Sequence, residues 1–438
     1  MIPHPERIAL HNEIHARPRP RVSSPCLVSH LALIRPPGAA ASPAALRELC
    51  LQYGIAPPGD GQSHFFGDFA RFRLKWERHG EFDDYTVYRN LMRADDPFGE
   101  PAIDALPSGW LAGVEGQLVA AVHVALVPDG PQWAHRDRIA AALGASDLIG
   151  ADLTDGAAVL YTDLHLDPNG YTRFLLVNRS MNASLAGRHL QRLLELEVYR
   201  MMAMLGFPVA RGAAAELNEL ERGLGKLVSR LESAPAEEEP EMLNEVTRLA
   251  ALAERIASET GFRTGASRAY HALVRQRSAD LREQRVAGLE TVTEFLERRF
   301  TPAMAFCESV DRRLAAAAER IDRASNLLRT RVEIEREAQN QLLLGAMNRR
   351  AKLQLRLQQT VEGLSVSPSA ITRSQCSAMR SRAWKRWDST STRIWQAALR
   401  SCPWWRLWRS PSGGCAARRA ANAIRSDAWV RARSLRPR

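Results

Sequence analysis

The chain has 438 residues, with 60 Lys+Arg against 49 Asp+Glu, 45% apolar residues and six cysteines. These totals exclude an acidic disordered tail protein, a collagen-like repeat and a disulfide-rich miniprotein, and they allow two or three ordinary domains. The net charge of +11 is unevenly placed. Residues 367–438 hold 16 Lys+Arg against Asp388 and Asp427, a formal +14, so residues 1–366 carry −3.

The N-terminus does not resemble a secretory signal, because prolines, histidines and arginines precede any apolar run. The most apolar window, residues 111–128, is interrupted by Glu115, Gln117 and His123, whereas a bilayer span needs about 20 nearly uncharged residues. We therefore expect no signal peptide and no transmembrane segment in the chain as written. The cysteines of residues 1–366 are scattered and are expected to be reduced structural thiols. They are Cys26, Cys50 and Cys307. We expect the protein to hold no metal and no cofactor.

Residues 1–180 show the mixture of short apolar runs and turn signals that is typical of a mixed α/β domain. Strands are predicted at residues 26–34, 69–77, 82–88, 117–127, 157–165 and 173–178, and helices at 43–53 and 136–143. The two runs on either side of Gly80 alternate apolar and polar residues, which predicts an antiparallel hairpin.

After residue 183 the periodicity becomes helical. Helices are predicted at residues 185–204, 213–233, 267–299 and 302–364, with an acidic loop at 235–240. The last helix carries a short 4-3 apolar seam, which indicates an antiparallel helix hairpin within one subunit. The seam is Val310, Leu314, Ala317, Ile321, Ala324 and Leu328. The predicted fold is an α+β N-terminal domain (1–180), a long antiparallel, coiled-coil-like helical domain (183–365) and a disordered tail (367–438).

The segment HNEIHARP at residues 11–18 is the first of two distinctive motifs. On a strand, His11, Glu13 and His15 would share one face and form a two-histidine, one-carboxylate metal set, whereas on a helix Glu13 would point away. Alternatively, Asn12, Glu13 and Arg17 cap and pin an irregular N-terminal arm. We favour the second interpretation, because short motifs of this kind often occur without a metal.

The second motif is WERHGEF at residues 76–82, at the turn of the predicted hairpin. Trp76 belongs to the apolar face, and Glu77, His79 and Glu81 alternate along the polar face. These three could form an acid/base cluster, because a histidine between carboxylates tends to have a raised pKa. We favour the alternative, in which they are solvated or paired across strands.

With LRLQQTVEGLS at residues 355–365, these motifs resemble a proteobacterial family of unknown function whose members are called uncharacterised membrane-anchored proteins. The resemblance covers roughly residues 1–366. It implies a cytosolic body of α/β and helical parts, tethered to the bacterial inner membrane by a hydrophobic C-terminal segment. It carries over no catalytic residues.

The tail departs from that pattern, because Arg/Ser/Trp/Cys-rich sequence follows Val366 where an apolar anchor is expected. One interpretation is a basic tail for nucleic acid or anionic lipid, in which Trp404, Trp405 and Trp408 stack on bases or lie at a membrane interface. We favour a frameshift. Tryptophan has the single codon TGG. If the last base of each codon is read with the first two bases of the next, that T becomes the second base of a codon. Every codon with T as its second base encodes Phe, Leu, Ile, Met or Val. The intended protein would then have a membrane anchor and no nucleic-acid partner.

The favoured function is a membrane-tethered cytosolic scaffold or sensor without catalysis, which forms a homo-oligomer through its long helices. The sequence has no nucleophile elbow, P-loop or dinucleotide fingerprint. One alternative is an ion-transport protein with the layout of CorA-type divalent-cation channels, although the Gly-Met-Asn signature of that family is absent. Another is a metal-dependent enzyme that uses the two His/Glu motifs.

Overall fold

The computed structural model describes residues 3–8, 11, 20–36, 38, 43–59, 61–90 and 96–366. The chain divides into two compact units, residues 1–342 and 343–438. The second unit is described only over its first 24 residues, 343–366, which form the end of the last helix. The tail that was predicted to be disordered, residues 367–438, lies outside the described residues.

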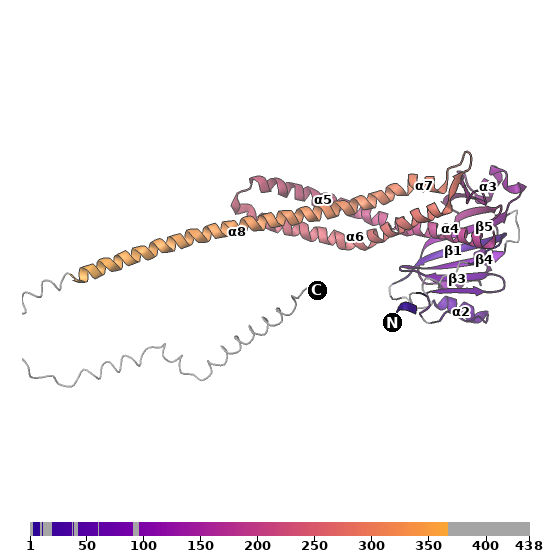
Figure 1. The fold of residues 1–438 in the computed structure, drawn as a ribbon, viewed down its shortest axis with the longest axis horizontal. Helices are drawn as coiled ribbons and strands as arrows, with labels where there is room; N and C mark the ends of the chain where they lie inside the picture. Colours follow the sequence, from indigo (N-terminus) through magenta and orange to yellow (C-terminus); the bar gives the residue numbers. More distant parts are fainter. Residues whose placement is uncertain are drawn as a thin grey trace, which may run out of the picture. The chain divides into compact units, whose positions relative to one another are not determined.

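Nine strands of the described chain form one mixed sheet in the order β2-β3-β4-β1-β5-β8-β7-β6-β9 (Figure 1). They are β1 (Cys26–Ile34), β2 (His64–Asp68), β3 (Arg73–Arg78), β4 (Phe82–Asn90), β5 (Gln117–Pro128), β6 (Ile149–Leu153), β7 (Ala158–Leu166), β8 (Thr172–Asn178) and β9 (Glu283–Arg285). Neighbours are antiparallel except β5 and β8, which are parallel. All six predicted strands are confirmed, and β2, β6 and β9 were not predicted.

The described part of the chain also forms seven α-helices, and helices pack on both faces of the sheet. They are α2 (Ala44–Gln52), α3 (Arg136–Leu143), α4 (Ala183–Met204), α5 (Gly206–Ser233), α6 (Glu239–Leu281), α7 (Val292–Arg299) and α8 (Thr301–Val366). Short 3-10 helices are η1 (Ala102–Ala105), η2 (Trp110–Gly113), η3 (Pro131–Trp133) and η4 (Ala236–Glu238). The predicted acidic loop is therefore reduced to a 3-10 turn and the start of α6.

Alternate residues of the strands supply buried apolar clusters on both faces of the sheet, because successive strand side chains point to opposite faces. On one face, Val28 and Val124 pack with Leu190 of α4 in a core that continues into α5, α6, α7 and α8. On the other, Trp76 packs with Leu46 of α2. A mixed sheet with long helices confirms the coarse fold prediction. The three predicted structural thiols are buried free cysteines: Cys26, Cys50 and Cys307.

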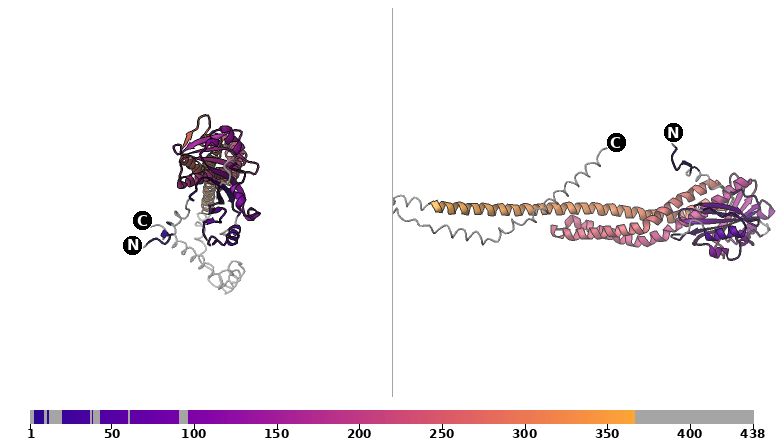
Figure 2. Two further views of the ribbon diagram at one scale, coloured as in Figure 1. Left: turned by 90° about the vertical axis from the view of Figure 1, so that its right-hand side faces the viewer. Right: turned by 90° about the horizontal axis from the view of Figure 1, so that it is seen from below.

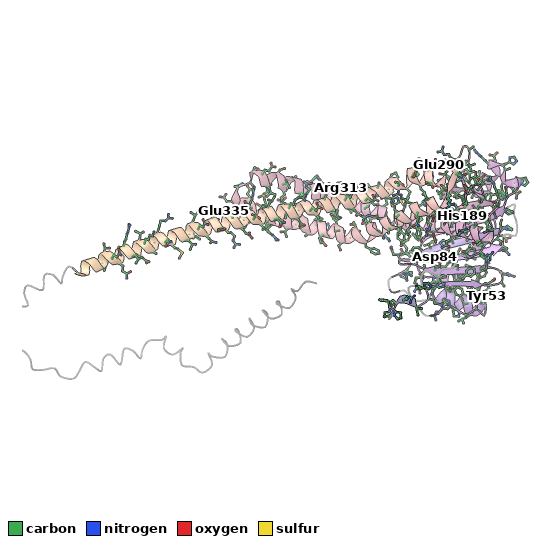
Figure 3. All side chains as sticks on the ribbon, in the orientation of Figure 1. Tyr53, Asp84, His189, Glu290, Arg313 and Glu335 are labelled. Atoms are coloured by element: carbon green, nitrogen blue, oxygen red, sulfur yellow. The ribbon has the colours of Figure 1, made fainter. Side chains whose placement is uncertain are left out.

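Within residues 1–342, helices α5, α6 and α8 lie side by side (Figures 1 and 2). Helices α5 and α6 are antiparallel, because Arg230 pairs with Glu245 at 2.9 Å while Arg255 pairs with Glu216 at 2.6 Å. In Figure 3, Arg313 marks where α8 meets α5. Its guanidinium lies 2.6 Å from the Glu221 carboxylate. All six seam residues of α8 are buried in the first core.

The prediction of one helix over residues 267–299 is wrong. Helix α6 ends at Leu281, and Arg282 takes a left-handed conformation with a φ of 50°. The chain then forms β9 against β6 and begins α7 with a capping box between Thr291 and Glu294. Because the capping box satisfies backbone donors at a new N-terminus, it stabilises a helix start where periodicity alone indicated continuation.

Gly187 allows an N-terminal segment to cross α4 closely. Val22 donates its backbone N–H to the Ala183 carbonyl at 3.0 Å, and a Cβ at Gly187 would overlap the carbonyl oxygen of Pro20. We expect Gly187→Ala to lower the free energy of unfolding by about 1–3 kcal/mol, because the crossing backbone must shift. Urea denaturation followed by circular dichroism measures this change.

The matched control is Gly212→Ala in α5, where an added Cβ meets nothing within 4 Å. There the substitution is expected to raise the free energy of unfolding by about 0.5–1 kcal/mol, because glycine loses more backbone entropy on folding than alanine. Equal effects at the two positions would contradict the close crossing over α4.

Candidate functional site

Of the first motif, only His11 is among the described residues. Asn12, Glu13, His15 and Arg17 lie outside them, so the metal and capping interpretations both stay predictions. The candidate site is therefore built on the second motif, at the β3–β4 hairpin.

The register of three neighbouring strands gathers charged side chains on the sheet face that α4 covers. Between β3 and β4, Glu77 is opposite Asp84 and Lys75 is opposite Thr86. Between β1 and β4, His30 is opposite Thr86. Side chains two residues apart share a face of a strand, so these residues lie in two adjacent rows. With His79 from the turn, we call His30, Lys75, Glu77, His79 and Asp84 the hairpin cluster.

The hairpin cluster is held by short polar contacts. Nε2 of His79 lies 3.0 Å from Oδ2 of Asp84, and Nζ of Lys75 lies 2.6 Å from Oε2 of Glu77. Glu77, His79 and Asp84 each present one possible ligand atom, and these atoms all lie within 4.8 Å of one another. Two carboxylates that face each other on neighbouring strands repel, so this arrangement requires compensating positive charge.

The turn that carries His79 is fixed from the neighbouring end of β1. The guanidinium of Arg35 donates to the carbonyl oxygens of His79 and Gly80 at 2.8 and 2.7 Å. The His79 ring stacks on Phe82, with ring centroids 4.4 Å apart. These contacts restrict the imidazole to the side of the hairpin on which Asp84 lies.

Helix α4 closes the site, so that a cavity of only about 20 Å³ remains. In Figure 3, Asp84 lies on the sheet near the start of the long helices. His30, Glu77 and Asp84 are only 3%, 6% and 7% exposed. From α4 the lining residues are Gln191, Leu194, Glu195, Val198 and Tyr199. Of the two possibilities in the favoured interpretation, solvation does not apply to Glu77, because a helix packs over the polar face of the hairpin. Pairing across the hairpin does occur, between His79 and Asp84.

Burial sets the protonation of the hairpin cluster. It raises the pKa of Glu77, and the nearby Asp84 charge raises it further. Burial also opposes ionisation of Asp84, but the hydrogen bond from His79 and the positive charges around it outweigh burial and lower its pKa. Burial lowers the pKa of His30 to about 4, so its imidazole is neutral at pH 7.

Four buried atoms that border this cavity have no hydrogen-bond partner within the described part of the chain. They are His30 Nε2, Glu77 Oε1, Asp84 Oδ1 and Gln191 Oε1. Each buried polar atom without a partner costs about 1–3 kcal/mol. The cavity is thus suited to a small polar or charged occupant that would satisfy these atoms.

Two candidate residues of the second motif, Trp76 and Glu81, lie outside the hairpin cluster. Trp76 is completely buried on the opposite face of the sheet. The carboxylate of Glu81 pairs with Arg263 of α6 at 2.8 Å and accepts a hydrogen bond from the Tyr270 hydroxyl at 3.3 Å. The predicted trio of Glu77, His79 and Glu81 is therefore incomplete, and Asp84 takes the place of Glu81.

Four further residues of the site were not predicted from the sequence: His30, Lys75, Asp84 and Gln191. One usable signal was present, because Asp83 and Asp84 interrupt an aromatic and β-branched strand. Charged residues are almost never buried without a partner, so a buried strand with carboxylates predicts partners on adjacent strands.

These observations define an α+β protein in which a mixed sheet carries a buried charged cluster under a helix that leads into long helices. The sequence pattern of a family described as "Protein of unknown function (DUF3422)" matches residues 2–372. The chain belongs to this family. No curated protein and no solved structure matches the chain. Among the residues with described positions, no helix combines the length and apolarity needed to cross a bilayer.

Proposed function

We propose that this protein is a non-catalytic sensor or scaffold that is tethered to the cytosolic face of a bacterial inner membrane. The size of the cavity at the hairpin cluster carries the non-catalytic part of the proposal. A volume of about 20 Å³ accommodates one water molecule or one ion. Pockets for organic ligands are typically about 300–1,000 Å³. The hairpin cluster is therefore better suited to detect a small occupant than to transform a substrate.

Two contacts link the cavity to the long helices. Glu195 and Tyr199 of α4 line the cavity. The Glu195 carboxylate pairs with Arg277 of α6, and the Tyr199 ring stacks on Tyr270 of α6 with centroids 5.8 Å apart. A change of occupancy that shifts α4 would therefore act directly on α6.

The sensor proposal predicts that a change in the hairpin cluster alters the dynamics of the helices. We expect Asp84→Asn to change amide hydrogen exchange in α4 and α6, because the substitution removes a charge beneath α4 and leaves Glu77 without its opposing carboxylate. Hydrogen-exchange mass spectrometry measures this peptide by peptide. Helix α3, on the opposite face of the sheet, serves as the internal reference.

The control substitution is Glu100→Gln, because the Glu100 side chain is 66% exposed and pairs with Arg89 away from the cavity. It should leave exchange in α4 and α6 unchanged. An Asp84→Asn protein with wild-type exchange in α6 would contradict the coupling.

The membrane tether is supported by the resemblance, by the codon argument and by the extent of the family match. That match ends at residue 372, close to the change in composition after Val366. Sequencing the gene around codons 364–370 tests the frameshift, and an uninterrupted frame in several isolates would rule it out. The frame-corrected protein is expected in the membrane fraction.

The alternative functions make different demands on assembly. A channel of the CorA type requires a pentamer of the frame-corrected protein, whereas a scaffold or sensor can also act as a monomer or dimer. Analytical ultracentrifugation in detergent separates these states.

We propose no nucleic-acid partner, because the charge of +14 lies in the tail that we attribute to the frameshift.

A further inference from the structure

We propose that Glu77, His79 and Asp84 bind a divalent transition-metal ion, with His30 beside them in the same cavity. The inference rests on the proposed sensor function, because it names the signal that the hairpin cluster would detect. It also departs from the sequence-based expectation of no metal site. The three residues come from two strands and the turn between them, and their ligand atoms already lie within 4.8 Å of one another.

Each carboxylate uses one oxygen within the cluster and leaves the other for a ligand. Glu77 Oε2 contacts Lys75, and Glu77 Oε1 has no partner among the described residues. Asp84 Oδ2 contacts His79, and Asp84 Oδ1 likewise has no partner there. Both residues are more than nine-tenths buried. A bound cation would satisfy both oxygens and offset the repulsion between the carboxylates.

His30 adds an independent indication that the cavity takes a cation. Its side chain is 97% buried, its Nδ1 lies 2.9 Å from Thr86 Oγ1, and its Nε2 borders the cavity without a partner. In metal-binding histidines, a hydrogen bond to one ring nitrogen usually fixes the ring, so that the second ring nitrogen points at the metal. The bond to Nδ1 of His30 fixes its Nε2 in the same way. When Nδ1 carries the ring hydrogen and donates it to Thr86, Nε2 carries a lone pair that can bind a metal.

The donor types and the space define the class of metal. Imidazole nitrogen and carboxylate oxygen suit Zn²⁺, Mn²⁺ and Fe²⁺, whereas Cu⁺ prefers the sulfur ligands that are absent from this set. Calcium requires six to eight oxygen ligands, and a cavity of about 20 Å³ does not provide room for them. The two carboxyl groups of Glu77 and Asp84, with the two imidazoles beside them, form a donor set that suits a cation better than an anion.

The test uses the purified full chain after dialysis against EDTA. Titration with Zn²⁺ and with Mn²⁺ in a calorimeter, together with metal analysis of the washed protein, should give one ion per chain. We expect Asp84→Asn and Glu77→Gln each to weaken binding at least about tenfold, because each removes a charged ligand. Failure of the wild-type chain to bind either metal stoichiometrically would overturn the proposal.

Two controls locate the ion. Glu81→Gln changes a carboxylate of the same hairpin that pairs with Arg263 instead, and it should bind like the wild type. His15→Ala tests the N-terminal motif and should also leave binding unchanged. If His15→Ala abolishes binding, or if Asp84→Asn binds as tightly as the wild type, the site is not in the hairpin cluster.

A second measurement avoids the possibility that Asp84→Asn fails to fold. The wild-type midpoint of thermal unfolding should rise with added Zn²⁺ and return to its original value with EDTA, because a ligand of the native state stabilises it. The absence of a shift at saturating Zn²⁺ would overturn the proposal. Metal binding without altered exchange in α6 would refute the sensor function alone, whereas altered exchange in Asp84→Asn without metal binding would refute the metal site alone.

Discussion

Replacing Trp76 with alanine is expected to lower the free energy of unfolding by about 3–5 kcal/mol. Trp76 is completely buried and lies in a cross-strand row between Phe65 of β2 and Tyr85 of β4. Removing the indole loses the burial of a large apolar surface and leaves a cavity that three strands cannot fill by relaxing. Urea denaturation followed by circular dichroism measures the loss.

Phe66→Ala is the matched control, because Phe66 lies next to Phe65 on the same strand but is 45% exposed. It is expected to cost about 1 kcal/mol, since much of the ring is already in water. Trp76→Ala should also leave Zn²⁺ binding by the folded protein unchanged, because the tryptophan faces away from the hairpin cluster. If Trp76→Ala cost no more than Phe66→Ala, Trp76 would not occupy the core.

Acidification from about pH 6.5 to about pH 4 is expected to destabilise the protein strongly. Burial is the largest influence on four histidines. It lowers the pKa of His30, His123 and His189 from the ordinary 6.5 to about 4, and it also lowers the pKa of His271. Between these two values the unfolded chain binds protons that the folded chain does not, so the free energy of unfolding falls as the pH falls. One pKa unit corresponds to about 1.4 kcal/mol, so each of the first three histidines contributes on the order of 3 kcal/mol.

Glu77 acts in the opposite direction, because burial raises its pKa and protonation relieves part of the cost of burying its charge. Burial also raises the pKa of Glu283, and these two carboxyl groups do not offset the histidines. Urea midpoints measured at pH 7, 6, 5 and 4 give the slope. His123→Asn keeps a possible acceptor for the Ser29 hydroxyl, which lies 2.9 Å from His123 Nδ1, and should reduce the slope by removing one titrating group. A stability that is constant from pH 7 to pH 4.5 would contradict the burial of these histidines.

The strands and helices that have one apolar face could be predicted from the pattern of residues in the sequence. Leu74 and Trp76 alternate with Lys75 and Glu77, and the structure buries the first pair in the core as expected. The six seam residues of α8 are buried as expected, because their spacing follows the helical period, but their burial does not establish a coiled coil. By contrast, β9 has the sequence Glu283-Gln284-Arg285 and no apolar face, so only backbone pairing with β6 makes it a strand.

The candidate site could be predicted only in part. Glu77 and His79 are close along the chain and were recognised together, but His30 reaches them through the pairing of β1 with β4. The cover over the cluster comes from α4, whose amphipathic pattern does not indicate which face of the sheet it meets. Single-sequence patterns therefore locate charged residues on a strand face, but tertiary packing decides whether that face is exposed.

The position of β9 at the edge of the sheet has a consequence for synthesis of the chain. Strand β6 (Ile149–Leu153) is made long before its outer partner β9 (Glu283–Arg285) emerges from the ribosome. Until then β6 presents unpaired backbone groups, which is the type of edge that recruits other strands. The hairpin of α5 and α6 must be made before β9 can return to the sheet. The sheet is thus finished late, after most of the helical region has been translated.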